Sequence, residues 1–100
     1  MSREPKGYVI ARVTVSDPEA YAAYAKAAGD AQKKYGAKVL VRGGAHVALE
    51  GAARPRNVVL EFESLAQAQA YYHSAEYQAA KMKREGVATA EIVAVQGVEG

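Results

Sequence analysis

Three consecutive residues, Arg42-Gly43-Gly44, are the strongest local sign of chemistry in this sequence. Two glycines after an arginine let the backbone come close to another group, and the guanidinium can bind a carboxylate. The alternative is a β-bulge that ends a strand, with Arg42 paired to Glu61 across the sheet. A phosphate-binding loop is excluded, because neither a Gly-Lys-Ser/Thr sequence nor a helix follows the two glycines.

Glu61 and His46 are the residues that could move a proton. A partly buried Glu61 could act as a general base, although a structural ion pair with an arginine is the alternative role. His46 and His73 are the only histidines, and nothing places them with a carboxylate at metal-ligand spacing, so we predict no metal site. A single histidine can hold a haem iron, which leaves His46 as a haem ligand as a further alternative.

A second group of polar residues lies on the last predicted helix, around the break expected at His73 and Ser74. Tyr72, Tyr77 and Arg84 could line a pocket there, or the tyrosines could pack on the sheet with their hydroxyls at the rim. Arg54 and Arg56 could collect an anion at a pocket mouth, or remain solvated. The predicted ligand-binding residues are Arg42, Gly43, Gly44, Arg56, Tyr72, Tyr77 and Arg84, with Glu61 and His46 as the catalytic residues and no cofactor.

The first half of the chain predicts a strand, a helix and a strand. Residues 7–15 alternate with β-branched side chains and have one wholly apolar face. Asp17 is a typical N-cap and Pro18 fits the first helical position. The helix should run to about Tyr35, before a glycine that ends it. Residues 38–42 are the second predicted strand, with Val39 and Val41 on its apolar face.

The second half repeats the order strand, helix, strand. Residues 46–50 could continue the second strand beyond the two glycines, and residues 57–62 are the third strand. Ser64 caps a helix over residues 65–72, and Ser74 looks like a second cap, which predicts a break before the helix resumes over residues 75–85. Residues 91–98 are the fourth predicted strand, with Val93 and Val95 on one face and Ile92, Ala94 and Gln96 on the other.

This order predicts an α+β fold, a ferredoxin-like βαββαβ sandwich with two helices on one face of an antiparallel four-stranded sheet. The helix-free face is then too apolar to be left exposed to solvent and too charged to form a water-free core. We expect it to pair with a second copy of the chain, with Arg12 and Arg42 available to Glu61, whereas the alternative is an ordinary solvated face. Its predicted residues are Tyr8, Ile10, Arg12, Leu40, Arg42, Val59, Glu61, Ile92, Ala94 and Gln96.

Composition limits the class of protein. One hundred residues with half of them apolar predict one domain over 1–100, with a core at about 6–98. The formal net charge is +2 with scattered basic residues, and no nucleic-acid reading motif is present. There is no cysteine, which excludes disulfides. No apolar stretch approaches the ~18 residues of a membrane span and no signal peptide is apparent, so we expect a cytoplasmic protein.

Several segments together resemble the family of the domain of unknown function 1330, within the dimeric α/β-barrel superfamily. The resemblance covers nearly the whole chain and implies two ferredoxin-like protomers that pack their sheets into a barrel. Superfamily relatives include monooxygenases, muconolactone isomerases, haem-degrading proteins and chlorite dismutases, and fold kinship alone does not transfer chemistry. The segments are residues 6–13, 17–21, 35–37, 41–44, 49–51, 54–56, 59–64 and 72–78.

Three functional hypotheses follow, of which haem binding through His46 is the third. The first is a cofactor-free enzyme, monooxygenase- or isomerase-like, that acts on a small anionic organic ligand held by Arg42. The second is a non-enzymatic ligand-binding or self-association module. A pocket above about 300 Å³ that contains Arg42 and an unpaired Glu61 would favour the enzyme. Arg42 and Glu61 paired without a cavity would favour the module.

Overall fold

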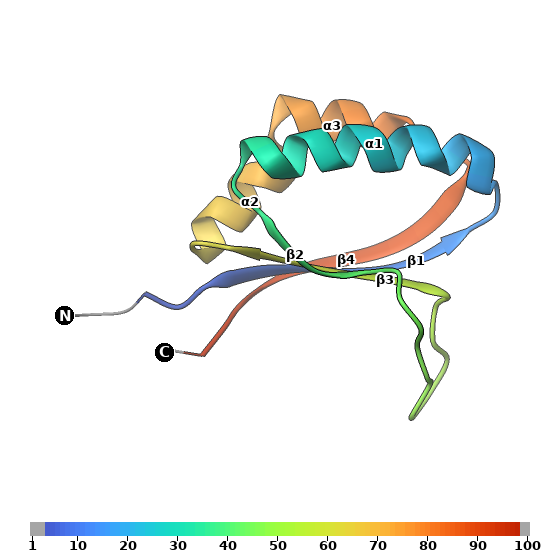
Figure 1. The fold of residues 1–100 in the computed structure, drawn as a ribbon, viewed down its shortest axis with the longest axis horizontal. Helices are drawn as coiled ribbons and strands as arrows, with labels where there is room; N and C mark the ends of the chain where they lie inside the picture. The colour runs from blue at the N-terminus through green and yellow to red at the C-terminus, as the bar shows by residue number, and fades with distance from the viewer. Residues whose placement is uncertain (1–3, 99–100) are drawn as a thin grey trace.

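The computed structural model describes residues 4–98. Four strands and three helices follow one another in the order β-α-β-β-α-α-β (Figure 1). Their bounds are β1 Gly7–Val15, α1 Pro18–Lys34, β2 Lys38–Arg42, β3 Arg56–Phe62, α2 Leu65–His73, α3 Ala75–Met82 and β4 Ala88–Gln96.

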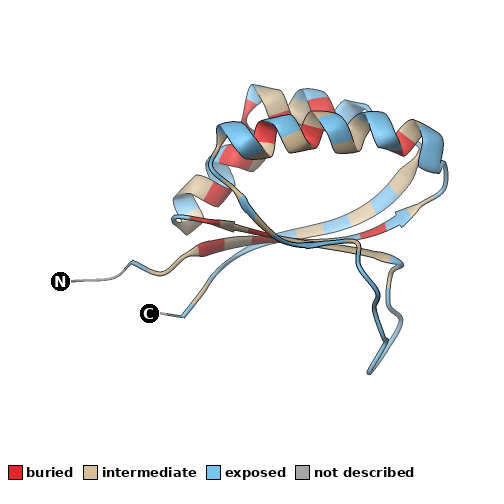
Figure 2. Ribbon diagram, viewed as in Figure 1, coloured by how far each residue is buried: buried red, intermediate tan, exposed pale blue. Residues whose placement is uncertain are grey.

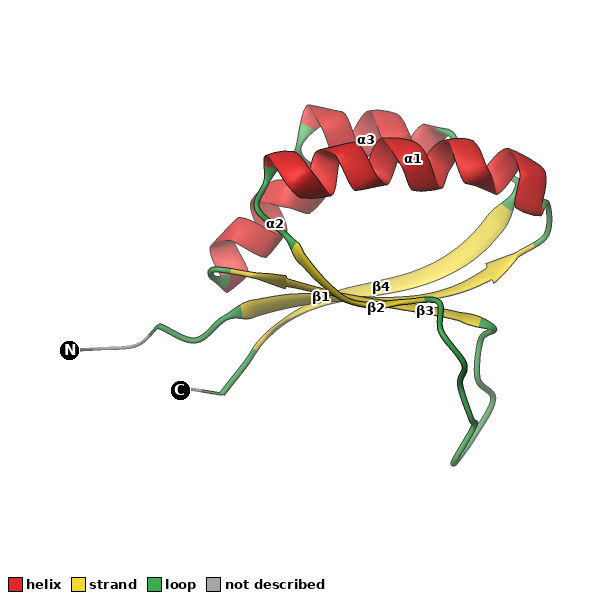
Figure 3. Ribbon diagram, in the orientation of Figure 1, coloured by secondary structure: helices red, strands yellow, loops and turns green. Residues whose placement is uncertain are grey.

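The strands form one antiparallel sheet in the order β2-β3-β1-β4. All three helices lie on the same side of this sheet and leave its other side uncovered (Figure 3). The predicted ferredoxin-like α+β class is therefore confirmed. The predicted break in the second helix is also confirmed, because α2 and α3 are separate helices that meet at Ser74.

Local hydrogen bonds explain where the helices begin. The Oδ1 atom of Asp17 accepts from the backbone N–H of Ala20 at 3.1 Å, and Pro18 occupies the first turn. Ser64 caps α2 by accepting from the N–H of Gln67 at 3.1 Å. Both caps agree with the sequence.

The core lies between the helices and the sheet, where α2 packs closely on β1, β3 and β4 and α3 packs on α1 and α2. Figure 2 shows the buried segments facing each other across these layers. Phe62 of β3 and Tyr77 of α3 are the largest fully buried side chains. Burying an apolar side chain of this size contributes about 1.5–3 kcal/mol. The other buried members of the core cluster are Val9, Ala28, Ala31, Leu60, Ala68, Tyr71 and Ala80.

The bulge in β2 lies earlier than predicted and reverses the direction of Arg42. Val39 pairs with Leu60, whereas Val41 pairs with Val59 and Arg42 with Val58, so Leu40 is the extra residue. Directly paired residues share a face of the sheet. The predicted position of Arg42 on the helix-free face is therefore wrong, and Val41 takes its place there.

The faces of β4 are also opposite to the prediction. Ile92 pairs with Ala11 and Ala94 with Val9, so both lie on the helix side, and Gln96 shares their parity. Val93 and Val95 are the residues on the helix-free face. Both faces of this strand are apolar, so the alternation of its residues does not predict which face lies toward the helices. The register with β1 determines that orientation.

Several predicted boundaries shift, and β4 ends at Gln96 rather than at residue 98. β4 begins at Ala88 rather than residue 91, because the Val87 carbonyl accepts from the N–H of Ser16 and aligns the strand with all of β1. α3 ends at Met82 rather than residue 85, because the next N–H groups bond to carbonyls three residues back. Residues 46–50 form no strand, since no neighbouring strand pairs with them.

The loop over residues 43–55 extends away from the helices, beyond the uncovered side of the sheet (Figure 1). Arg12 donates to the carbonyl of Ala52 at 3.1 Å, and Arg54 donates to Glu91 at 2.8 Å. These contacts tie the loop to β1 and β4. Among residues 4–98, no helix has the length and apolar character needed to cross a lipid bilayer.

Candidate functional site

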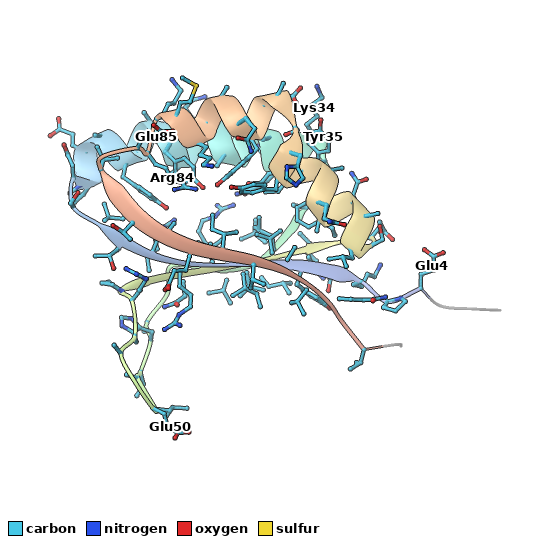
Figure 4. The ribbon with its side chains drawn as sticks, turned by 180° about the vertical axis from the view of Figure 1, so that it is seen from behind. Glu4, Lys34, Tyr35, Glu50, Arg84 and Glu85 are labelled. Carbon is cyan, nitrogen blue, oxygen red and sulfur yellow. The ribbon has the colours of Figure 1, made fainter. Side chains whose placement is uncertain are left out.

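A cavity of about 590 Å³ lies between the helices and the sheet. Aliphatic side chains of all four strands form its floor, and tyrosines from the three helices form much of its roof. Figure 4 shows side chains of the helices and of the sheet pointing into the space between the two layers. The main lining residues are Val9, Ala11, Val13, Val39, Val58, Leu60, Ile92, Tyr21, Tyr24, Tyr71, Tyr72 and Tyr77.

Two arginines from neighbouring strands line this cavity. Arg42 faces it because of the bulge in β2, and Arg56 faces it because it shares the inner side of β3 with Val58. The Arg56 guanidinium stacks on the Tyr21 ring, with its central carbon 5.5 Å from the ring centroid. The Nε atom of Arg56 is buried and has no hydrogen-bond acceptor among the described residues. This end of the cavity therefore carries concentrated positive charge.

Gly43 makes room for Arg56. A Cβ atom at this position would lie 2.6 Å from an Nη atom of Arg56, and the backbone φ angle is +64°. Both conditions favour glycine. Gly44 has open space around it, so it has no comparable contact with the site.

A tyrosine pair stands in the roof of the cavity. The hydroxyls of Tyr24 and Tyr77 are 2.9 Å apart. Burial, followed by the proximity of Tyr77, raises the pKa of Tyr24 well above its ordinary value. Burial raises the pKa of Tyr71 in the same way, although a hydrogen bond from Gln32 opposes the shift. The hydroxyls of Tyr24 and Tyr71 therefore keep their protons at neutral pH.

Arg84 lies next to Tyr24, under the helices on the side that faces the sheet (Figure 4). Its guanidinium carbon is 5.5 Å from the centroid of the Tyr24 ring. Although burial acts to lower the pKa of Arg84, interaction with the Tyr77 and Tyr24 hydroxyls outweighs it and raises that pKa. Arg84 is therefore a permanent cation at the edge of the tyrosine cluster.

The structure brings together only some of the predicted site residues. Arg42, Arg56, Tyr72 and Tyr77 line the cavity, while Gly43 and Arg84 contact lining residues.

The two predicted catalytic residues lie elsewhere. Glu61 is on the helix-free face, where its Oε2 atom accepts from the Tyr8 hydroxyl at 3.1 Å. The expected pairing of Arg12 or Arg42 with Glu61 is absent from the ion pairs of residues 4–98. His46 is exposed in the loop over residues 43–55. Neither side chain reaches the cavity.

Sequence reasoning missed the contribution of α1 to the site. Tyr21, Tyr24 and Gln32 line the cavity but are not among the predicted site residues. The signal was available in the residue type, because a hydroxyl on an inward-facing position requires a polar partner. Asp30 is the only carboxylate in the lining, and it is exposed and paired with Lys26 at 3.5 Å.

The part of the chain that the structure describes contains no cluster of three or more histidine, cysteine, aspartate or glutamate side chains that could hold a metal ion. The polar groups that line the cavity are mainly the guanidinium groups of the arginines and the hydroxyls of the tyrosines. The guanidinium groups and the phenols can bind an anion and donate hydrogen bonds to it. Asp30 is the one carboxylate in the lining that could accept a proton.

Comparison with known proteins places the chain in a family whose function is not known. The family described as "Domain of unknown function (DUF1330)" matches residues 6–98. No curated protein sequence matches the chain.

Solved structures share the fold. A protein of unknown function from Rhodopseudomonas palustris is 20% identical, with a TM-score of 0.72 over 99% of this chain and 87% of that one. A structure named as a candidate antibiotic biosynthesis monooxygenase from Caulobacter crescentus is 18% identical, with a TM-score of 0.61 over 98% and 94% of the two chains. A dimeric ferredoxin-like protein of unknown function from Bacteroides fragilis is 16% identical, with a TM-score of 0.56 over 91% and 95%.

Proposed function

The chain belongs to the family of the domain of unknown function 1330, and we propose that it binds a small anionic organic molecule in the cavity between its helices and its sheet. The observation that carries this proposal is the presence of Arg42 and Arg56 at one end of a cavity walled by tyrosines and aliphatic side chains. Neither arginine forms an ion pair with a carboxylate among residues 4–98.

The charge argument concerns Arg56 most directly. Removing a cation from water is costly unless an anion and hydrogen-bond acceptors compensate it. The ring of Tyr21 compensates part of the charge, but the buried Nε donor has no acceptor among the described residues. A carboxylate in the cavity would supply the compensating charge and accept hydrogen bonds from the guanidinium of Arg56.

The shape of the cavity agrees with an organic ligand rather than a simple inorganic ion. Its volume of about 590 Å³ lies within the range of small-molecule sites. The walls are mostly apolar, so the body of the ligand would bury hydrophobic surface while its acid group meets the arginines. Tyrosine faces are suited to stacking with a planar group.

Binding is better supported than catalysis by Glu61 or His46. The cavity is large enough and contains Arg42, but Glu61 lies on the opposite face of the sheet with Tyr8. General base catalysis requires the base within hydrogen-bonding reach of the substrate. We therefore propose ligand binding, and a reaction in this cavity would have to use groups that line it.

We also propose that the helix-free face pairs with a second copy of the chain. Val93 is 53% exposed and Val95 43% exposed on this face, and Ile10 and Val59 lie beside them. Together they form an apolar patch on the uncovered side of the sheet. The Bacteroides fragilis protein with the same fold is dimeric, which supports this pairing.

The test of ligand binding is a thermal-shift screen with a library of small carboxylic acids, followed by calorimetry on the best acid. We expect Arg56→Gln to weaken that acid about tenfold to hundredfold, because a hydrogen bond to a charged group contributes about 1.5–3 kcal/mol. Lys83→Gln is the matched control, since Lys83 is exposed and lies outside the cavity. The proposal is wrong if no acid raises the melting temperature, or if both variants weaken binding equally.

A further inference from the structure

Charged side chains lie at both ends of the helix-free face, on either side of its apolar middle. Ile10 of β1 and Val59 of β3 are paired in this middle. Tyr8, which pairs with Glu61, comes two residues before Ile10, and Arg12 comes two residues after it. Because each strand residue rises by about 3.4 Å, the acidic end and the basic end are about equally far from the middle.

Arg12 has no acidic partner among residues 4–98. Its guanidinium donates to the carbonyl of Ala52 at 3.1 Å. Glu91 lies beside Arg12 in the sheet, but its carboxylate forms an ion pair with Arg54 at 2.8 Å. None of the ion pairs in the described part of the chain includes Arg12. An acid from another molecule can therefore bind to this exposed cation.

Glu61 has the complementary position at the other end of the face. Its Oε2 atom accepts from the Tyr8 hydroxyl at 3.1 Å. Lys38 lies across from Glu61 on β2, but no ion pair joins the two in the described structure. A carboxylate has two oxygens with about four lone-pair sites, so Glu61 can accept further hydrogen bonds from a guanidinium.

We propose that the two copies of the chain stack their helix-free faces with the strands in opposite directions, so that Arg12 of each protomer binds Glu61 of its partner. A two-fold axis that crosses the strands at Ile10 places the basic end of one sheet over the acidic end of the other. Each contact then occurs twice, as two-fold symmetry requires. Stacked sheets lie about 10 Å apart, a distance that an arginine and a glutamate from opposite sides can bridge.

The alternative orientation has a two-fold axis along β1. It places Arg12 over Arg12 of the other copy, and these like charges repel each other. Charge complementarity therefore favours the axis across the strands. The inference rests on the proposed pairing of the helix-free faces. It adds the relative orientation of the two sheets and the contact that determines this orientation.

Single charge reversals test the contact in the full chain. Arg12→Glu and Glu61→Arg each place like charges at both contacts of the dimer. We expect either variant to raise the dissociation constant about tenfold or more, because juxtaposed like charges repel across an interface. Lys83→Glu and Glu85→Arg change the net charge by the same amounts at exposed positions after α3, on the other layer, and should leave the dimer unchanged. Sedimentation velocity measures all four.

A mixture of the two reversals shows whether the contact joins two protomers. When an Arg12→Glu protomer pairs with a Glu61→Arg protomer, both contacts again join opposite charges. We expect this heterodimer to be about tenfold or more tighter than either homodimer, and native mass spectrometry resolves the three dimers by mass. A contact within one protomer predicts no such preference. Arg12→Gln and Glu61→Gln remove the charges without repulsion, and they should weaken the dimer by a smaller factor if a reversal fails to fold.

The outcomes separate the inference from the proposed pairing. If the unsubstituted chain stays a single protomer, both are rejected. If it forms a dimer that the reversals weaken no more than Lys83→Glu and Glu85→Arg do, the orientation is overturned and the pairing stands. The inference is also overturned if the reversals weaken the dimer and their mixture forms no preferred heterodimer.

Discussion

Gly43 couples the backbone of β2 to the position of a binding group. Its φ angle of +64° lies in the left-handed region, and the space that a side chain would need is filled by the Arg56 guanidinium. The same residue thus ends a strand and lets an arginine from the next strand lie against the backbone. Gly51 has a φ angle of +71° but open space around it. A substitution at Gly51 therefore strains the backbone without a contact to Arg56.

We expect Gly43→Ala to lower the free energy of unfolding by about 1–2 kcal/mol, because a Cβ atom strains the left-handed backbone. It should also weaken carboxylate binding by displacing Arg56. Gly51→Ala is the matched control and should lose stability without losing affinity. Denaturant unfolding and calorimetry measure the two quantities. Equal affinities of the two variants would show that the contact between Gly43 and Arg56 does not matter for binding.

The buried tyrosines predict a loss of stability at high pH. Burial raises the folded-state pKa of Tyr24 and Tyr71 above their unfolded value of about 10. A proton is therefore held more tightly in the folded state. The stabilising contribution is complete below about pH 10 and is lost as the pH rises above it, because only the unfolded state ionises there.

This prediction is measured as the melting temperature between about pH 8 and about pH 11. We expect the melting temperature to fall steeply above about pH 10, and less steeply in Tyr24→Phe, which lacks one of the raised groups. Phenolate absorbance gives an independent readout. If Tyr24 and Tyr71 ionise at about pH 10, the ordinary value for a tyrosine, while the circular dichroism stays native, the burial argument is contradicted.

At the scale of elements, the break between α2 and α3 positions the roof of the cavity. The Ser74 Oγ atom donates to the Tyr71 carbonyl at 2.7 Å and accepts from the Tyr77 N–H at 3.0 Å. One buried hydroxyl therefore ends one helix and begins the next. As a result, Tyr71 and Tyr77 face each other with ring centroids 5.0 Å apart.

We expect Ser74→Ala to reduce the free energy of unfolding by about 1–2 kcal/mol, the usual cost of removing an N-cap. The loss should exceed that of Ser64→Ala, because Ser64 is half-buried and its hydroxyl caps only one helix. Ser74→Thr keeps the hydroxyl and is the conservative control. Denaturant unfolding measures all three, and an Ser74→Ala protein as stable as the parent would exclude this role.

At the scale of the whole molecule, the helix-free face and the loop over residues 43–55 lie on the same side (Figure 1). Val47 of this loop is 80% exposed and Leu49 is 90% exposed. They add to the apolar surface offered by Val93 and Val95. A second copy that covers the sheet would therefore lie next to the loop as well, and the proposed dimer would hide both.

We expect Val93→Lys to dissociate the proposed dimer at micromolar concentration, because two-fold symmetry places the new charge in the interface twice. The folded protomer should persist, since Val93 is 53% exposed within it. Met82→Lys changes an exposed residue of α3, 72% exposed and on the other layer, and should leave the assembly unchanged. Sedimentation velocity measures both, and a protomer of unit mass in the unsubstituted protein contradicts the pairing.

The sequence by itself determined the elements, because their signals are local. Asp17 and Pro18 begin α1, and the alternation of residues 7–15 makes β1. Ser74 marks the break in the second helix. Each of these depends on dihedral preferences and hydrogen bonds within a few residues, and the order of the elements then restricts the fold to the ferredoxin-like sandwich.

Only the tertiary structure decided which side chains share the cavity. The bulge at Leu40 turns Arg42 inward, and the register with β1 sends Val93 and Val95 outward. The same bulge separates Glu61 from Arg42, whereas Arg12 shares the face of Glu61 but pairs with Asn57, farther along β3. A shift of one residue moves a side chain to the other face of a sheet, and that shift depends on the partner strand rather than on the residues of the strand itself.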